Sequence, residues 1–159
     1  MHLICGAPGA GKTTYAAALA ARVRGLKFSL DDWMASLFLA DRPTPPTLNW
    51  AKQRIDRCEA MIWSIAVDIV GRNVDVVLDF GFARQDHRDA ARMKALQVRA
   101  RPRLHYLDVD PETRLARVRE RNLRGEGVYA VSDAMFEQLE KAFEVPTDDE
   151  LVDAMIIGD

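Results

Sequence analysis

The sequence predicts one α/β domain over residues 1–159, in which a parallel sheet is covered by helices on both faces. Three observations support this fold class. Short apolar runs alternate with stretches of helical periodicity, as in folds built from parallel strands. The length suits one compact domain. Turns rich in glycine or acidic residues follow the first three apolar runs, at the sheet edge where such folds bind ligands.

The first half of the chain contains two predicted strands and three predicted helices. The strands are the apolar runs Leu3–Cys5 and Leu26–Leu30. Helical spacing of apolar or alanine-rich positions predicts helices over Lys12–Arg24, from the pair Asp31-Asp32 through Leu39, and over Leu48–Val70. Prolines exclude regular structure before the third of these helices, because proline removes a backbone donor and restricts the residue before it.

The second half continues the alternation. Val74–Asp79 and Leu104–Val109 are predicted strands, and Arg84–Arg99 is a predicted helix between them. The remaining expected elements are a helix with Asp110 as N-cap and Pro111 in its first turn, a helix over Ser132–Phe143, an acidic surface connection over Val145–Glu150 and a short apolar element over Ala154–Ile157.

Composition narrows the class of protein. Lys and Arg number 22 against 24 Asp and Glu, and this net charge of −2 does not favour binding to a long nucleic-acid duplex. The two cysteines are isolated, and Cys5 is expected to be a core residue. No apolar stretch approaches the roughly 18 residues of a membrane span, and the N-terminus lacks the positive region of a signal peptide. We therefore predict a cytoplasmic protein with no membrane partner.

Residues 6–13 form a phosphate-binding loop motif. They fit the Walker A pattern G-x-x-x-x-G-K-[ST] between a predicted strand and a predicted helix. Backbone N–H groups of such a loop surround the β-phosphate at the positive end of the helix. We expect Lys12 to reach the β- and γ-phosphates, and the hydroxyl of Thr13, or less favourably Thr14, to ligate Mg²⁺. The predicted nucleotide-binding residues here are Gly6, Ala7, Pro8, Gly9, Ala10, Gly11, Lys12, Thr13 and Thr14.

The acidic pair Asp31-Asp32 follows the second predicted strand. A carboxylate at this position faces the γ-phosphate, where it can orient an acceptor hydroxyl and take its proton. Asp31 is the better candidate, because Asp32 suits the N-cap or first turn of the next helix. The alternative interpretation is that both residues only cap that helix.

The end of the third predicted strand supplies further candidates. Asp79 occupies the position from which an acidic residue commonly holds Mg²⁺ through water. Phe80 follows it, whereas hydrolytic motors often have a glutamate there, and the guanine-specifying pattern N-K-x-D is absent. Arg84 is either a clamp for an anionic group on the acceptor or a plain surface arginine. The pattern favours transfer of a phosphoryl group to a hydroxyl over hydrolysis.

Several arginines gather between residues 114 and 124. Arg114, Arg117 and Arg121 share a helix face by their spacing, and Arg124 precedes a glycine-containing segment. Phosphoryl transfer needs positive charge on the equatorial oxygens and a lid that excludes water. We therefore predict a mobile lid over about residues 112–130 with Arg121 and Arg124 as its cations. A solvated basic face is the alternative.

Together these motifs resemble the small P-loop kinases, a family that includes polynucleotide 5′-kinase domains, zeta toxins and chloramphenicol phosphotransferase. The shared pieces are the phosphate loop, the Asp31-Asp32 pair, Asp79 and the segment Arg121-Asn122-x-Arg124-Gly125. The resemblance implies a three-layer sandwich with a five-stranded parallel sheet, in which the 155–158 run is the last strand.

The resemblance also implies roles for individual residues. Asp31 corresponds to the general base, Arg121 and Arg124 correspond to the lid arginines on the ATP phosphates, and Arg114 or Arg117 would flank the adenine. Polynucleotide kinases carry an arginine three residues after the catalytic aspartate, where it binds an acceptor phosphate. This chain has Met34 there, within an apolar stretch that suits a less charged acceptor.

The leading hypothesis is a kinase that uses Mg-ATP and a small hydroxyl-bearing acceptor. The acceptor is expected near Asp31, Asp32, Met34 and Arg84, with the Pro43–Pro46 loop and the helix bearing Trp50 and Trp63 as candidate walls. One alternative is a kinase for the 5′-hydroxyl of DNA or RNA. Another is a module that binds ATP without catalysis.

Overall fold

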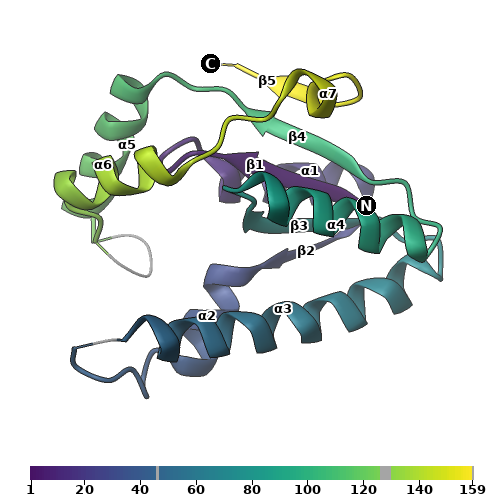
Figure 1. The fold of residues 1–159 in the computed structure, drawn as a ribbon, viewed down its shortest axis with the longest axis horizontal. Coiled ribbons are helices and arrows are strands. Elements are labelled where there is room, and N and C mark those ends of the chain that lie inside the picture. The colour runs from purple at the N-terminus through teal and green to yellow at the C-terminus, as the bar shows by residue number, and fades with distance from the viewer. Residues whose placement is uncertain (46, 126–129, 159) are drawn as a thin grey trace.

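A computed structural model describes residues 1–45, 47–125 and 130–158. Within them, a five-stranded, all-parallel sheet has the strand order β2-β3-β1-β4-β5 (Figure 1). The first strand lies in the middle of the sheet with β3 on one side and β4 on the other. Ligands of open parallel sheets bind at such a point, beyond the carboxyl ends of the strands. The strands are β1 (His2–Gly6), β2 (Leu26–Ser29), β3 (Val76–Gly81), β4 (Arg103–Leu107) and β5 (Met155–Ile157).

Seven helices accompany the sheet in the described part of the chain, and none of them is long and apolar enough to cross a membrane. Most bounds lie within two residues of the predicted ones. The helices are α1 (Lys12–Val23), α2 (Leu30–Phe38), α3 (Leu48–Val70), α4 (Gln85–Gln97), α5 (Pro111–Leu123), α6 (Asp133–Ala142) and α7 (Asp148–Leu151).

The sheet separates two apolar layers, because successive side chains of a strand point to opposite faces. Leu3 and Cys5 of β1 pack into one layer, which α3 and α4 cover. Ile4 packs into the other layer against α1. The predicted sandwich of helices on both faces of a parallel sheet is therefore confirmed, as is the core position of Cys5.

The pair of helices α2 and α3 lies beside β2, at one edge of the sheet (Figure 1). A small apolar cluster joins the two helices through Leu30, Met34 and Cys58, with Ile55 and Phe80 packed against it. The helix α2 starts at Leu30, one residue earlier than expected, because the hydroxyl of Ser29 caps it by accepting a hydrogen bond from the Asp32 N–H at 3.2 Å. Asp31 and Asp32 thus both lie in the first turn of α2.

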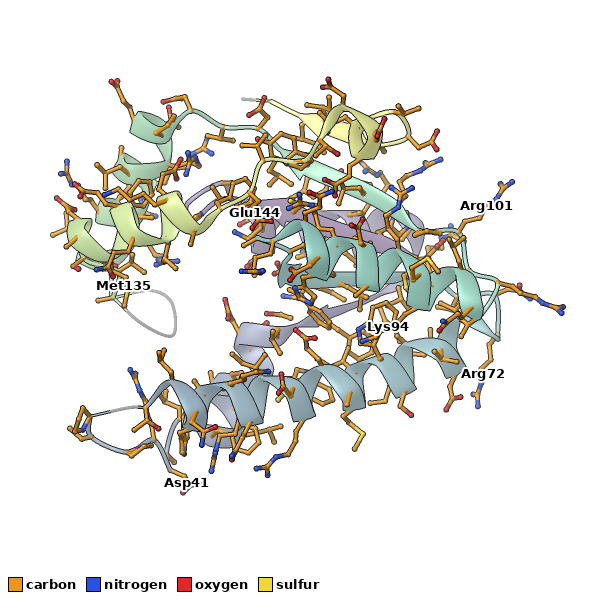
Figure 2. All side chains as sticks on the ribbon, viewed as in Figure 1. Asp41, Arg72, Lys94, Arg101, Met135 and Glu144 are labelled. Atoms are coloured by element: carbon orange, nitrogen blue, oxygen red, sulfur yellow. The ribbon has the colours of Figure 1, made fainter. Side chains whose placement is uncertain are left out.

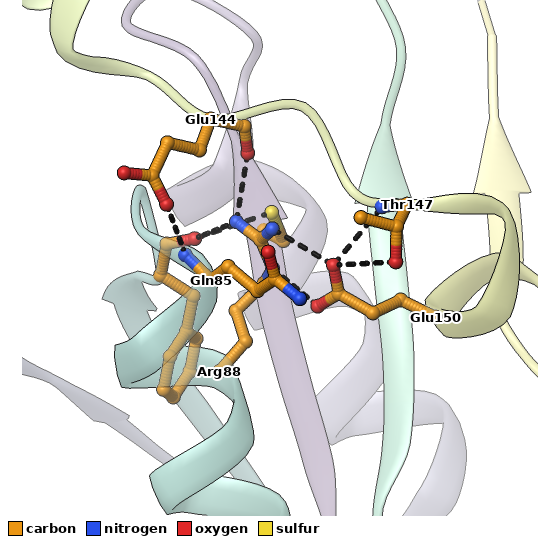
Figure 3. Close-up of polar contacts among 7 residues, drawn as sticks. Gln85, Arg88, Glu144, Thr147 and Glu150 are labelled. Carbon is orange, nitrogen blue, oxygen red and sulfur yellow. Dashed lines mark hydrogen bonds and ion pairs between the residues drawn. The ribbon is translucent and has the colours of Figure 1, made fainter.

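The acidic segment before β5 is not a simple surface connection, which corrects the prediction. It contains α7, and Glu150 of this helix forms an ion pair with the fully buried Arg88 of α4 (Figure 3). The Arg88 Nε–H donates to Glu150 at 2.6 Å, and its Nη1 donates to the carbonyl oxygens of Phe82 and Glu144. Glu150 also accepts from the Thr147 N–H at 3.0 Å. Arg88 therefore connects the C-terminal segment, through Glu144 and Glu150, with Phe82, the residue that follows β3.

Candidate active site

The phosphate loop connects the end of β1 at Gly6 with the start of α1 at Lys12. Gly9 and Gly11 have φ values of 80° and 88°, in the left-handed region that favours glycine. A Cβ at Gly9 would lie 2.4 Å from the Arg114 carbonyl oxygen, so the loop is pressed against α5. Gly11 is the N-cap of α1 and supplies no capping side chain. The first N–H groups of α1 are therefore available to an anion.

A pocket of about 510 Å³ lies beside this loop. It is bounded by the first turns of α1 and α2, the end of β3, and parts of α5 and α6. Figure 2 shows Met135 and Asp41 at the same end of the molecule. Met135 belongs to α6, and Asp41 follows α2. Gly6, Ala7 and Ala10 are buried parts of the loop that do not line the pocket. The predicted site residues that do line it are Pro8, Gly9, Gly11, Lys12, Thr13, Thr14, Asp31, Asp79, Arg117, Arg121 and Arg124.

Lys12 lies between the loop and two carboxylates. Its ammonium group donates to the Ala7 carbonyl oxygen at 3.1 Å, which folds the side chain back over the loop. Burial lowers the pKa of Lys12, and the negative charges of Asp79 and Asp31 oppose this shift. A cation held in this way, close to loop N–H groups, is suited to an incoming phosphate.

Thr13 and Asp79 form the candidate metal site. The Thr13 hydroxyl is hydrogen-bonded to the Asp79 carboxylate, although the two residues come from α1 and β3. Burial raises the pKa of Asp79, while the Thr13 hydrogen bond and the Lys12 charge lower it. No group of three or more His, Cys, Asp or Glu side chains in the described ranges is arranged to hold a metal ion. A hydroxyl and one carboxylate fit Mg²⁺, which keeps waters and phosphate oxygens as its other ligands.

Asp31 and Asp32 occupy different environments despite being adjacent. Asp31 lines the pocket that contains Lys12 and Thr13. Asp32 instead pairs with the Lys27 ammonium group at 3.2 Å. The backbone of a helix's first turn points consecutive side chains in different directions, so only one of the two can face the phosphate loop.

The arginines of α5 also differ in their environments. Arg117, Arg121 and Arg124 line the pocket, and Arg124 pairs with Glu120 one turn earlier. The Arg121 Nε is buried, and no hydrogen-bond acceptor for it lies among the residues that the structure describes. A buried donor without an acceptor at the edge of this pocket fits a phosphate oxygen. Residues 126–129 of the predicted lid, including Gly127, lie outside the described residues.

Arg114 is not among the lining residues of the pocket, so of the two alternatives that the resemblance implied for the adenine, only Arg117 lies there. Arg114 is 4% exposed and pairs with Glu140 of α6. Its Nε–H donates to the Val109 carbonyl oxygen at 2.8 Å, and its Nη1 donates to the Pro8 carbonyl oxygen at 3.4 Å. Arg114 therefore connects the phosphate loop with the end of β4 and with α6.

Arg117 does reach a second hollow, beside α1. Its lining includes Tyr15 of α1 and Ile157 and Gly158 at the end of β5. Gly11 and Thr14 line this hollow as well as the first pocket, so the two are continuous around the phosphate loop. The 155–158 run follows the prediction, because β5 pairs with β4 as the last strand.

Three predicted acceptor residues lie outside the main pocket: Asp32, which pairs with Lys27, and Arg84 and Met34. Arg84 precedes α4 as an exposed residue and pairs with Asp86 at 2.8 Å, so it does not line the pocket. Met34 is buried between α2 and α3 and lines a separate, smaller cavity that also includes Asp31.

Sequence reasoning missed several pocket residues. Phe80 and Gly81 follow Asp79 on β3, which extends two residues beyond its predicted end. The sequence contained part of the signal, because glycine at a strand end often marks a close backbone approach. In the structure Gly81 has a φ of 78°. Val131 and Leu139 reach the pocket from the α6 region, and no local pattern indicates this.

The sequence matches the profile of AAA_33, described as an AAA domain, over residues 1–146. The chain belongs to this family. Its fold is P-loop kinase-like, so the resemblance drawn from the motifs is confirmed at the level of the family. A comparison with curated proteins found no match.

Solved structures share the fold of this AAA_33 member. A candidate kinase from Chloroflexus aurantiacus aligns with a TM-score of 0.76 at 20% identity, over 99% of this chain and 86% of that chain. Kti12 from Chaetomium thermophilum, solved with ADP-AlF3, aligns with a TM-score of 0.73 at 17% identity, over 99% and 88%. A gluconokinase from Sinorhizobium meliloti aligns with a TM-score of 0.65 at 14% identity, over 99% and 81%. At these identities the similarity establishes the fold.

Proposed function

We propose that the protein is a kinase that transfers the γ-phosphoryl group of Mg-ATP to the hydroxyl of a small molecule. One observation carries this proposal: a single pocket is lined by the phosphate loop with Lys12, by the carboxylate of Asp31, and by Arg121 and Arg124. A module that only binds ATP does not need a carboxylate beside the loop, whereas a phosphoryl transferase needs a base there.

The nucleotide is expected to lie along the phosphate loop. The N–H groups at the start of α1 and the ammonium group of Lys12 bind the β- and γ-phosphates. Arg121, whose Nε has no acceptor within the described residues, and Arg124 bind the outer phosphate oxygens. The hollow lined by Tyr15 and Arg117 accommodates the nucleoside.

Thr13 and Asp79 are the residues that would hold Mg²⁺. Their hydroxyl and carboxylate are already in contact across α1 and β3. Bound Mg²⁺ neutralises negative charge on the phosphates. The continuity of Asp79 with the β3 core keeps the carboxylate in place, because both residues before it are fully buried.

Asp31 acts on the acceptor. Its carboxylate accepts the proton of the acceptor hydroxyl while the acceptor oxygen forms a bond to the γ-phosphorus. The bond between that phosphorus and the bridging oxygen breaks, and its electron pair leaves with ADP. Lys12, Arg121 and Arg124 stabilise the charge that spreads over the transferred group.

The proposal is tested with ATP that carries radioactive phosphorus at the γ position. Wild type, Asp31→Asn and Asp32→Asn are each offered a panel of hydroxylated small molecules and a 5′-hydroxyl oligonucleotide. Asp32→Asn is the matched control, because it makes the same chemical change one residue away, at the partner of Lys27. Loss of a general base lowers the rate by roughly 100- to 10,000-fold, so transfer should be lost in Asp31→Asn and kept in Asp32→Asn.

Other outcomes would change the assignment. Label on the oligonucleotide, with strong salt dependence, would indicate a polynucleotide kinase instead. ATP binding that is indifferent to Asp31→Asn, with no labelled acceptor, would indicate an ATP-sensing module. Equal transfer by both variants would show that Asp31 is not the base.

A further inference from the structure

A cavity distinct from the hollow beside α1 lies between α2 and α3, next to the phosphate pocket. Its volume is about 280 Å³, close to the lower limit of the roughly 300–1,000 Å³ typical of small-molecule sites. We call it the acceptor cavity. It is lined by Leu30, Asp31, Met34, Arg42, Thr47, Leu48, Trp50, Ala51 and Ile55.

The walls of the acceptor cavity are mostly apolar. Leu30 and Met34 are 7% and 8% exposed, and they form one cluster with the buried Cys58 of α3. Ile55 packs against the same cluster. Trp50 adds an aromatic wall from the first turn of α3. These side chains offer mainly dispersion contacts and exclusion of water to a bound molecule, and the Trp50 indole N–H is a hydrogen-bond donor among them.

Several polar groups near the cavity have partners, although the buried Nε of Arg54 has no hydrogen-bond acceptor among the residues that the structure describes. The Thr47 hydroxyl caps α3 by accepting from the Trp50 N–H at 3.2 Å. The guanidinium of Arg54 lies 4.3 Å from the centroid of the Trp50 ring and donates to the Trp50 carbonyl oxygen at 3.1 Å. Arg42 is exposed and takes part in another interaction. An anionic group placed against the buried side chains of Leu30 and Met34 would lose its hydration, whereas Arg42, the cation in the lining, is exposed to solvent.

Asp31 lines both the acceptor cavity and the phosphate pocket. It lies at the start of α2, so it marks the junction of the two spaces. A molecule in the acceptor cavity can therefore place a hydroxyl at Asp31 while the rest of the molecule stays against the apolar walls.

We propose that the acceptor of this kinase is a compact, uncharged alcohol with an aromatic or aliphatic body that binds in the acceptor cavity. This inference rests on the proposed phosphotransferase function. The alcohol and ATP give a phosphomonoester and ADP, and the hydroxyl proton passes to Asp31. Sugar acids and nucleic-acid ends are disfavoured, because both bring a negative charge to the apolar walls.

The first test measures transfer with matched variants of α3. Ala51→Asp places a carboxylate in the acceptor cavity, and Ala60→Asp makes the same change at an exposed position of the same helix, outside the cavity. The acceptors are 2-phenylethanol and cyclohexylmethanol, with gluconate and a 5′-hydroxyl oligonucleotide as charged alternatives. We expect label on the uncharged alcohols, a KM for them at least tenfold higher in Ala51→Asp, and a wild-type KM in Ala60→Asp. The thermal shift caused by Mg-ATP reports whether each variant is folded.

The second test measures binding without catalysis. Titration with 2-phenylethanol should change the tryptophan fluorescence of the wild type, and Trp50→Phe should remove that change. Binding without transfer to any acceptor would support the cavity's ligand class and contradict the kinase function. A wild type that neither responds to nor phosphorylates the uncharged alcohols overturns the inference. Preferential labelling of gluconate or the oligonucleotide, or equal KM values in Ala51→Asp and Ala60→Asp, also overturns it.

Discussion

At the scale of single residues, Thr13 and Thr14 show that position decides the role of identical side chains. Both line the phosphate pocket. The Thr13 hydroxyl is hydrogen-bonded to Asp79, whose pKa burial raises and whose charged form this hydrogen bond favours. A metal ligand needs such a second group beside it to fix its orientation.

Replacing Thr13 by valine should weaken Mg²⁺ binding. The change keeps the shape of the side chain and removes the hydroxyl, and a loss of about 1.4 kcal/mol corresponds to a tenfold weaker affinity. We expect the Mg²⁺ concentration for half-maximal turnover to rise roughly tenfold in Thr13→Val and to stay near the wild-type value in Thr14→Val. A larger effect in Thr14→Val than in Thr13→Val would contradict the assignment and indicate Thr14 as the metal ligand.

Residue-level chemistry was predictable where the motif is local. The phosphate loop works through consecutive backbone groups and one lysine, so its sequence contains all of its parts. Arg114 and Arg117 are different, because they lie one turn apart on α5 with the same charge. Only packing makes Arg114 a buried brace and leaves Arg117 at the pocket.

At the scale of secondary-structure elements, Arg114 holds three of them together. It contacts the phosphate loop, the segment after β4, and Glu140 of α6. The close approach of Gly9 to the Arg114 carbonyl oxygen presses the loop onto the same turn of α5. Arg114 is therefore a positioning residue for the loop.

Arg114→Met should weaken both the fold and the nucleotide site. Removing one partner of a buried pair costs about 3 kcal/mol, whereas exposed pairs contribute less than about 1 kcal/mol. The matched control is Arg119→Met. Arg119 lies on the same helix as Arg114, and this change breaks its exposed pair with Asp133 of α6. Urea unfolding measures the free energy of unfolding, and titration with ATP measures the Kd, which should rise about tenfold in Arg114→Met alone. Unchanged ATP affinity in Arg114→Met would show that Arg114 does not position the phosphate loop.

Element bounds were predicted best where termini carry strong local signals. The helix α3 begins after the Thr47 cap and ends before Gly71, its C-cap, and its bounds Leu48–Val70 agree with the prediction. β3 was placed two residues too early at both ends, because hydrogen bonding to β1 and β2 decides where a strand stops. The short helix α7 was missed, since a four-residue helix has almost no periodic pattern.

At the scale of the whole molecule, a buried histidine links stability to pH. His105 of β4 is 1% exposed; its Nε2 lies 2.9 Å from Nδ1 of His2, and its Nδ1 lies 2.8 Å from the Tyr15 hydroxyl. Burial, followed by the charges of His2 and Arg103, lowers the pKa of His105 from 6.5 to about 4. Between these two values the unfolded chain binds a proton that the folded chain does not.

Stability should therefore fall as the pH decreases from about 6.5 to about 4. Below about pH 4, His105 should cause no further loss of stability. The contribution is at most about 3.5 kcal/mol, because the pKa of His105 falls from 6.5 to about 4, at about 1.4 kcal/mol for each tenfold change in proton affinity. The free energy of unfolding, measured across this range, should depend less on pH in His105→Gln than in wild type. An unchanged slope in His105→Gln would contradict the prediction.

The sequence by itself determined the fold class, the phosphate loop and the acidic residues at the ends of β2 and β3, because these follow from apolar periodicity and short motifs. The tertiary structure decided which of several similar charges serve the site. It paired Glu150 with Arg88 across 62 residues, buried Arg114 in a pair with Glu140 of α6, and joined Asp31 to an apolar cavity between α2 and α3. The physical reason is that burial and charge pairing depend on residues far apart in the chain, and a local pattern of like charges does not record which of them is desolvated.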